Sequence, residues 1–424
     1  MRAASWFGPH PPYAVRGEGC WLTDLEGRRM LDVANNFFSL IHGHAYAPVV
    51  SAVSQALAGG SAFGLPTLAE IELAEILRAR APLLEQTRFN NSGSEAVLQA
   101  LRGARAITGR HRMAKFEGAY HGTFDHVEVS YESDPANWDD AEGNPASTAY
   151  GRGVPPSVLA ETVVLPWNDP TRITAILERH GPSLACVILD PLASRIGMVP
   201  ASPAMLEALQ AARAKHGFLL VSDEVISFRL HPAGAHAHFG YTPDLVALAK
   251  IIGGGLPVGA VAGPARHMAV YDHTAGRPGA ALSGTFSANP LTMAAGIATL
   301  TAFDATAVTR LNGLGAQLRA ALTEGFSAHG IAVQVMGLGS LFRVHLSAGH
   351  IHDWRSSRAT AEAKRAITTI HAALMRRGVL LTPNLSGALS TPMGEAEVAL
   401  IAEGLVSECA AHWGSGAAWQ KEPA

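Results

Sequence analysis

Short apolar runs alternate with amphipathic stretches through the middle of the chain. Runs of four or five mainly apolar residues, typical of β-strands, lie at residues 112–116, 162–165, 185–189, 218–222, 245–248 and 258–262. Helical patterns cover residues 67–80, 95–107, 171–180 and 203–216. Nearly continuous apolar strands with helical crossovers are typical of a parallel sheet covered on both faces. The pattern predicts an α/β domain.

The pattern differs at the two ends of the chain. Residues 19–22 and 29–33 predict a hairpin with its turn at 24–27. After residue 305, two strands are predicted at 332–335 and 341–345, and helices at 307–326, 360–377 and 395–412. These elements predict a smaller α+β domain. We expect an N-terminal segment, residues 1–50, that belongs to this domain, a large domain at 51–304, and a C-terminal domain at 305–424.

Composition narrows the classes of function. Of the 424 residues 48% are hydrophobic and 16% charged, as in globular proteins. The net charge of -3 gives no electrostatic reason to bind nucleic acid or an anionic membrane. No apolar run reaches the length of a membrane span, and the first residues lack the apolar core of a signal peptide. Cys20, Cys186 and Cys409 are too far apart to suggest a disulfide framework or a metal site. We expect a cytoplasmic protein without a metal.

Residues 130–156 are polar and rich in Asp, Asn, Gly and Pro, which predicts a long surface loop. Loops of this length inside a compact domain are usually functional or mobile.

Lys250 stands out among the few lysines. It follows the apolar run DLVALA and precedes IIGGGLPVGA, whereas Lys115, Lys215, Lys364 and Lys421 lie in polar settings. Apolar burial lowers the pKa of an amine, as an imine-forming lysine requires. The glycines after it would let a ligand approach the backbone. The alternative is a lysine that extends from a strand end into solvent.

Asp223 lies at the end of another predicted strand, FLLVSDEV, and Glu224 follows it. Ligands of open α/β sheets bind at the carboxyl ends of the strands. A buried carboxylate there can pair with a protonated pyridine nitrogen and make the ring an electron sink. The alternative is an acid that only caps the strand.

Two loop segments add weaker signals. Ser92, Gly93 and Ser94 open an amphipathic helix, where backbone N–H groups and the helix dipole favour a phosphate; the alternative is an ordinary N-cap. Tyr120 and His121 lie between glycines after a predicted strand. An aromatic ring there could stack on a planar cofactor, although such a pair often serves only loop packing.

Taken together, these segments resemble the class III aminotransferases, and particularly their glutamate-1-semialdehyde aminomutase-like branch. The resemblance rests on NNSGSEAVLQALRGARAITGR, KFEGAYHG, VILDPLASRIGMVP, LLVSDEVISFR, LAKIIGGGLPVGAVAG and GTFSANPLTMAAG. It covers the chain from Arg2 to about residue 400. It implies fold type I of the pyridoxal 5′-phosphate enzymes, with a mainly parallel seven-stranded sheet. It also implies a homodimer with shared active sites.

The resemblance assigns roles to individual residues. Lys250 would carry the cofactor as a Schiff base and move a proton, and Asp223 would keep the pyridine nitrogen protonated. Tyr120 would cover one face of the ring, and we count these three residues as catalytic. The remaining expected cofactor contacts are Val225 on the other ring face, Gly93 and Ser94 at the phosphate, Thr285 at the phosphate of the neighbouring subunit, and Ser92, His121 and Asp190.

The expected substrate contacts are two arginines. The spacing of Arg2 from Arg16 matches a branch pattern in which an N-terminal arginine binds the substrate carboxylate through both oxygens; the alternative is a terminal arginine with no such role. Arg195 stands where the aminomutases commonly have Asn, near the expected substrate. Asp190 replaces the Glu usual in the family, and TPNLSGALST lacks the Glu expected in the aminomutases.

These departures count against glutamate-1-semialdehyde as the substrate. The segments RAASWFGPHPPYAVRGEG and DEVISFRL look closer to the β-amino-acid aminotransferases of the branch. We therefore expect an aminotransferase that moves an amino group from a small-molecule donor, a β-amino acid, to a 2-oxo acid. The alternatives are an aminomutase or amino-acid epimerase, an amine transaminase, and an inactive relative that only binds ligands. Intact Lys250 and Asp223 argue against the last.

Overall fold

The computed structural model describes residues 11–274 and 276–414, which form two compact units. The large unit holds residues 47–308 with 352–354, and the small unit holds the remaining described residues. The domain limits expected at residues 50 and 304 stay a prediction, because compactness does not show independent folding.

No single helix among the described residues is long and apolar enough to span a membrane. The pair α11 (Pro290–Ala302) and α12 (Ala305–Ala328) meets this test by length and composition only, and it is bent by 73°.

The large unit is built on a seven-stranded sheet in the order β4-β12-β11-β10-β7-β5-β6. Its strands are β4 (Gln86–Asn90), β5 (Arg112–Phe116), β6 (Thr162–Leu165), β7 (Leu184–Leu189), β10 (Leu219–Asp223), β11 (Leu245–Ala249) and β12 (Gly259–Gly263). Strand β12 runs antiparallel to both of its neighbours, β11 and β4, and the other six strands share one direction. The mainly parallel sheet predicted from the sequence is confirmed, with β4 as the strand that the apolar pattern missed.

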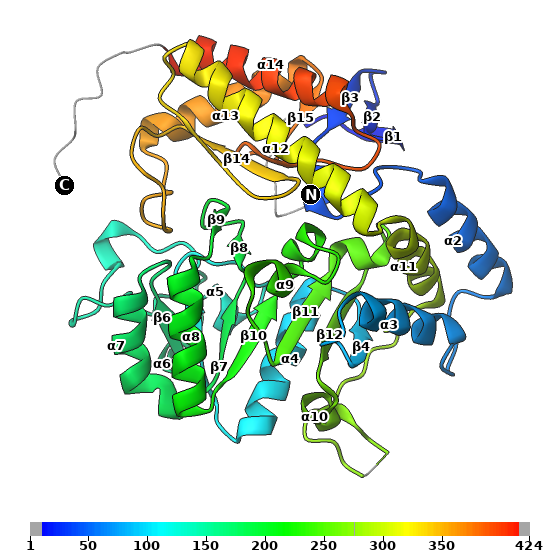
Figure 1. The fold of residues 1–424 in the computed structure, drawn as a ribbon, viewed down its shortest axis with the longest axis vertical. Helices are drawn as coiled ribbons and strands as arrows, with labels where there is room; N and C mark the ends of the chain where they lie inside the picture. The colour runs from blue at the N-terminus through cyan, green and yellow to red at the C-terminus, as the bar shows by residue number, and fades with distance from the viewer. Residues whose placement is uncertain (1–10, 275, 415–424) are drawn as a thin grey trace. The chain divides into compact units, whose positions relative to one another are not determined.

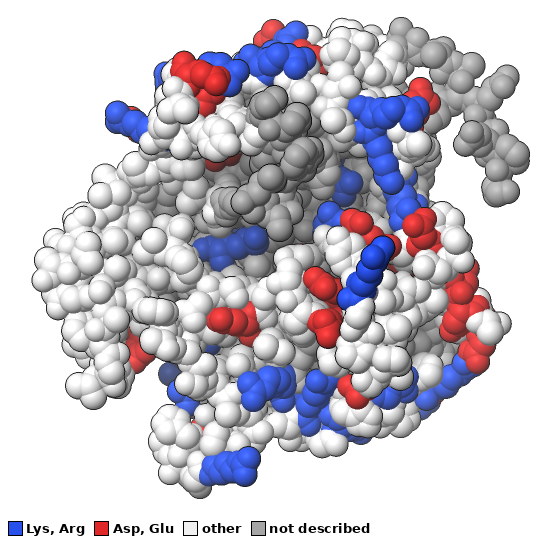
Figure 2. Space-filling model, turned by 180° about the vertical axis from the view of Figure 1, so that it is seen from behind, with Lys and Arg blue, Asp and Glu red and all other residues white. Residues whose placement is uncertain are grey.

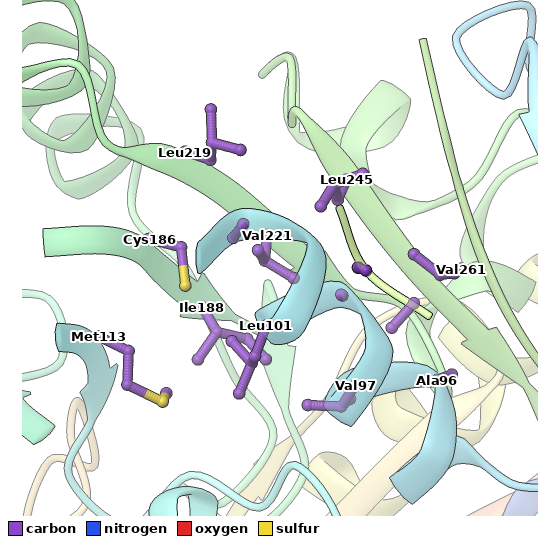
Figure 3. Packing of buried hydrophobic residues seen from close by; sticks show 14 of the residues in the cluster. Ala96, Val97, Leu101, Met113, Cys186, Ile188, Leu219, Val221, Leu245 and Val261 are labelled. Carbon is purple, nitrogen blue, oxygen red and sulfur yellow. The ribbon is translucent and has the colours of Figure 1, made fainter. Parts of the chain in front are cut away.

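The helices of the large unit connect these strands (Figure 1). They are α2 (Ala47–Gly59), α3 (Leu68–Arg80), α4 (Gly93–Thr108), α5 (Asp125–Glu128), α6 (Pro156–Glu161), α7 (Pro170–His180), α8 (Pro203–His216), α9 (Ala235–Phe239), α10 (Ala265–Met268) and α11. A short β8–β9 pair (Leu192–Ala193, Val199–Pro200) follows β7. Helix α4 packs against β7, β10, β11 and β12. In Figure 3 its residues Val97 and Leu101 lie with Ile188 and Val221 in one buried cluster, which fixes the start of α4 relative to the strand ends.

The small unit has α+β character. One sheet has the order β1-β2-β3-β15, and the other β13-β14-β16. Their strands are β1 (Ala14–Glu18), β2 (Trp21–Asp24), β3 (Arg29–Asp32), β13 (Gln334–Met336), β14 (Leu341–His345), β15 (Val379–Leu380) and β16 (Ser386–Ala388). Its helices are α1 (Asn35–Phe38), most of α12, α13 (Ala361–Arg376) and α14 (Glu395–Trp413). The predicted hairpin is the β2–β3 pair, extended by β1.

Acidic and basic side chains are interspersed on the face seen in Figure 2. This mixture fits the small net charge of the chain. All three cysteines are free and buried.

Candidate active site

Neighbouring strands bring the predicted site residues to one edge of the large sheet. Asp223 is the last residue of β10, Asp190 follows β7, and Lys250 follows β11. Tyr120 and His121 lie in the loop after β5. These four strands are parallel and adjacent. Their carboxyl ends therefore meet at one edge, where open α/β sheets bind ligands.

Lys250 has a strained backbone and a reactive amine. Its φ is 53°, and left-handed residues other than glycine cost about 1–3 kcal/mol and cluster at functional sites. Burial lowers the pKa of the Lys250 amine to about 8, while the negative charge of Asp223 acts in the opposite direction. Part of the amine is therefore unprotonated near neutral pH and able to attack a carbonyl carbon.

Asp223 is held by a buried histidine. His121 Nδ1 lies 2.8 Å from Asp223 Oδ2, and the Val225 N–H donates to Asp223 Oδ1 at 3.1 Å. Burial lowers the pKa of His121, although the Asp223 carboxylate opposes this. A neutral His121 donates through Nδ1, which orients the carboxylate. The sequence named both residues as site residues but gave no sign of this bond, because they are 102 positions apart.

Asp190 is a second buried acid at the same edge. Its Oδ1 accepts a hydrogen bond from the Leu192 N–H at 3.1 Å. Burial, and then the negative charge of Asp223, raise the pKa of Asp190 to about 8. Asp190 therefore keeps its proton at neutral pH, which limits charge repulsion beside Asp223.

Glu224, the acid next to Asp223, is a structural residue. It is fully buried. Its carboxylate accepts from the N–H groups of Ala235 at 2.6 Å and His236 at 3.0 Å, and lies 2.7 Å from His236 Nδ1. These contacts anchor the chain after β10 and leave Asp223 as the acid that faces a ligand site.

The start of α4 lies against the segments that carry Asp223 and Lys250. A Cβ added to Gly93 would be 3.1 Å from Val225 Cγ1 and 3.5 Å from Ala249 Cβ. Ser92 caps the helix by accepting from the Glu95 N–H at 3.1 Å, as the N-cap alternative expects. Ser94 Oγ accepts from the Thr123 N–H at 3.2 Å. The free N–H groups of this first turn can bind an anion.

Tyr120 belongs to an aromatic cluster that the sequence did not predict. Its ring centroid is 5.6 Å from that of Tyr131, which is 4.9 Å from that of Tyr150. The guanidinium carbon of Arg195 lies 4.5 Å from the Tyr131 centroid. Burial and Asp223 raise the pKa of Tyr120, and Arg195 opposes this, so Tyr120 lies within electrostatic range of both charges. The structure thus brings Arg195 near the predicted site.

Two further predicted residues are not placed in this group by the contacts above. Thr285 is exposed in a turn before α11, and Arg2 lies outside the described residues. The expectation that Lys115 sits in an ordinary polar setting is wrong: it is fully buried in β5, and its Nζ donates to the Val129 carbonyl at 2.7 Å. Burial lowers the pKa of Lys115 to about 7. The apolar neighbours Met113 and Phe116 were the available signal.

Comparisons with known proteins find relatives in sequence and in fold. The sequence model of the family described as aminotransferase class-III matches residues 4–386. A glutamate-1-semialdehyde 2,1-aminomutase from Thermomicrobium roseum is 38% identical, with 91% of this chain and 87% of the relative covered. A solved omega-transaminase from Sphaerobacter thermophilus is 44% identical, with a TM-score of 0.95 and coverage of 98% and 94%. A solved β-phenylalanine aminotransferase from Variovorax paradoxus is 33% identical, with a TM-score of 0.86 and coverage of 97% and 90%.

The charge environment of Lys250 predicts its titration. In protein freed of bound small molecules, labelling of Lys250 by an amine reagent should be half-maximal near pH 8, against the ordinary value of 10.5. Asp223→Asn should move this midpoint lower, because the lost charge no longer favours the ammonium. Peptide mass mapping across a pH series measures both, with the exposed Asp272→Asn as the control. A midpoint that stays the same or rises in Asp223→Asn would show that the two groups do not interact.

Proposed function

The chain belongs to the class III aminotransferase family, and from this premise we propose that it moves an amino group between a β-amino acid and a 2-oxo acid. Its cofactor is pyridoxal 5′-phosphate, as in the family. The observation that carries the proposed substrate class is the guanidinium of Arg195. This group lies over Tyr131 near Tyr120, and its buried Nε has no hydrogen-bond partner among the described residues.

The residues at the strand ends fit this cofactor. Gly93 leaves a space at the start of α4 that a Cβ would fill, in contact with Val225. The first turn of α4 offers N–H groups for a phosphate, Asp223 offers a carboxylate for the ring nitrogen, and Lys250 offers an amine. When bound, the cofactor supplies an aldehyde that bonds to amines and a ring that takes up electrons.

Two residues would share the chemistry. The Lys250 amine, with its lowered pKa, would hold the cofactor at its aldehyde carbon. The same amine would act as the base that moves a proton to and from the substrate carbon that bears the amino group. Asp223, oriented by His121, would keep the ring nitrogen protonated. Tyr120 and Val225 would cover the two ring faces.

The remaining roles concern binding. Gly93 and Ser94 would hold the phosphate, with Ser92 as the cap of the same helix. Asp190, which keeps its proton, would support Asp223 from the neighbouring strand.

The site would take a substrate with a carboxylate and an apolar or aromatic side chain. A carboxylate buried in the site needs a charge partner, which Arg195 supplies, and we assign Arg2 the same task. Tyr120, Tyr131 and Tyr150 would pack against an aromatic group. The similarity to a β-phenylalanine aminotransferase supports this choice. The alternative is an isomerase, supported by the 38% identity to an aminomutase, in which the amino group returns to the same molecule.

A donor assay separates these reactions. We expect 3-amino-3-phenylpropanoate alone to convert the bound cofactor to its amino form once per site. Continuous formation of the 3-oxo acid should need an added 2-oxo acid, because a transferase must pass the amino group on. Absorbance of the cofactor and chromatography of the products measure the two steps. Turnover of glutamate-1-semialdehyde without an acceptor would instead establish the aminomutase, and turnover restricted to 1-phenylethylamine would establish an amine transaminase.

We also propose a homodimer, formed through an apolar patch of Phe63, Leu65, Leu68 and Ile71. Leu65 and Leu68 are 78% and 83% exposed in the chain. Contiguous exposed apolar side chains mark interaction surfaces. Asn289 Nδ2 donates to the Ser61 carbonyl at 2.8 Å, which joins the turn that carries Thr285 to the loop before this patch. A second copy on the patch would bring Thr285 towards the phosphate of its partner.

The dimer predicts a change of mass on mutation. Light scattering after gel filtration should give twice the chain mass for the wild type and a smaller mass for Leu65→Glu with Leu68→Glu, because charges do not pack in an apolar interface. Leu25→Glu is the control, since Leu25 is 71% exposed but lies in the small unit. A monomeric wild type with full activity would contradict the shared site.

A further inference from the structure

The long loop between residues 130 and 150 closes on itself at its base. The Ser130 N–H donates to the Thr148 carbonyl at 2.8 Å, and Ser130 Oγ to the Ala146 carbonyl at 2.6 Å. This closure places Tyr131, at one end of the loop, next to Tyr150 at the other. The loop therefore presents the Tyr131 ring beside Tyr120, and Glu132 follows Tyr131 in the chain.

Arg195 meets this loop through two kinds of contact. Its guanidinium lies over the Tyr131 ring, an arrangement that attracts a cation. Its Nη2 forms an ion pair with Glu132 Oε1. The Nε hydrogen is buried and has no partner in the described part of the chain. Glu132 thus uses only one donor of a fork that can bind both oxygens of a carboxylate.

We propose that Glu132 is a specificity-determining residue, whose carboxylate pairs with Arg195 until a substrate carboxylate displaces it. This inference rests on the proposed function and names the group that competes with the substrate. The substrate carboxylate would bond to both Nε and Nη2. Tyr131 would hold the guanidinium in place throughout, because its contact does not depend on which carboxylate is bound.

The contacts of Arg195 allow a substrate carboxylate to replace Glu132. The side chains of Arg195 and Glu132 are 32% and 46% exposed, and ion pairs with this access to water are weak. A ligand that satisfies the buried Nε as well gains a hydrogen bond that Glu132 does not make. A substrate without a carboxylate leaves the Glu132–Arg195 pair intact, so no unpaired charge remains beside it. The pair would therefore let the site accept both acidic and uncharged side groups.

Glu132→Gln in the holoenzyme tests this competition. The probe is 3-phenylpropanoate, a carboxylate without an amine, and its uncharged comparison is 3-phenylpropanamide; calorimetry measures the Kd of each. Removing the competing charge should lower the Kd of the acid by about threefold to tenfold and leave that of the amide within about twofold. Glu142→Gln is the matched control, because Glu142 lies on the same loop and forms an exposed ion pair with Arg179.

Arg195→Gln gives the second arm. It should weaken binding of the acid, and Glu132→Gln should add nothing in that background, because the two residues act through one contact. With 3-amino-3-phenylpropanoate as donor, Glu132→Gln should lower KM and leave kcat unchanged, since Glu132 touches no reacting atom.

Several outcomes would overturn the proposal. The first is that Glu132→Gln leaves the Kd of the acid unchanged, and the second is that this variant does not bind the acid. The third is that Glu132→Gln lowers the Kd of the acid to the same extent when Arg195 is already replaced by Gln. Failure of the proposed function gives a different result: Arg195→Gln would then leave both binding of the acid and turnover of the β-amino acid unaltered. If Arg195→Gln weakens both but Glu132→Gln changes neither, only the competition is refuted.

Discussion

Burial of the Lys250 amine beside two buried carboxyl groups is the constraint on which the rest of the site depends. Low polarity around the amine lowers its pKa, whereas the negative charge of Asp223 limits that shift. The balance holds the pKa of the amine near 8, close enough to neutral pH for the group both to attack a carbonyl and to carry a proton. Because Asp190 keeps its proton, Asp223 is the one of these two carboxyl groups that carries a negative charge.

Several parts of the fold hold Lys250, Asp223 and Asp190 in place. Parallel strands set the positions of the three groups, and the packing of α4 on β7, β10, β11 and β12 sets where an anion can bind relative to them. Glu224 fixes the chain after β10 through three hydrogen-bonding contacts, and His121 fixes the Asp223 carboxylate. Arg195 lies in the turn between β8 and β9, and its partner Glu132 lies on the long loop that begins at residue 130.

The sequence predicted the parts of the fold that carry a strong local pattern. Strands β5, β6, β7, β10, β11 and β12 are mainly apolar and buried, and each was predicted from its apolar run. Strand β4, with the sequence QTRFN, is mainly polar and was not predicted. Lys250, Asp223 and the start of α4 were predicted as a site because strand ends meet at one edge. Contacts between distant residues were not predicted: His121 and Asp223 are 102 positions apart, and Glu132 and Arg195 are 63 positions apart. The setting of Lys115 was predicted wrongly as polar. Such pairings depend on tertiary packing, which no local pattern encodes.

Two lysines, Lys115 and Lys250, have a lowered pKa, and we expect only Lys250 to bond to the cofactor. Lys115 is more perturbed, with a pKa of about 7, but its Nζ is enclosed and bonded to the Val129 carbonyl. Reduction of the holoenzyme with borohydride, followed by peptide mass mapping, identifies the lysine that is bonded to the cofactor. We expect one pyridoxyl group per chain, on the peptide that contains Lys250. The label on Lys115, or no label on any lysine, would contradict it.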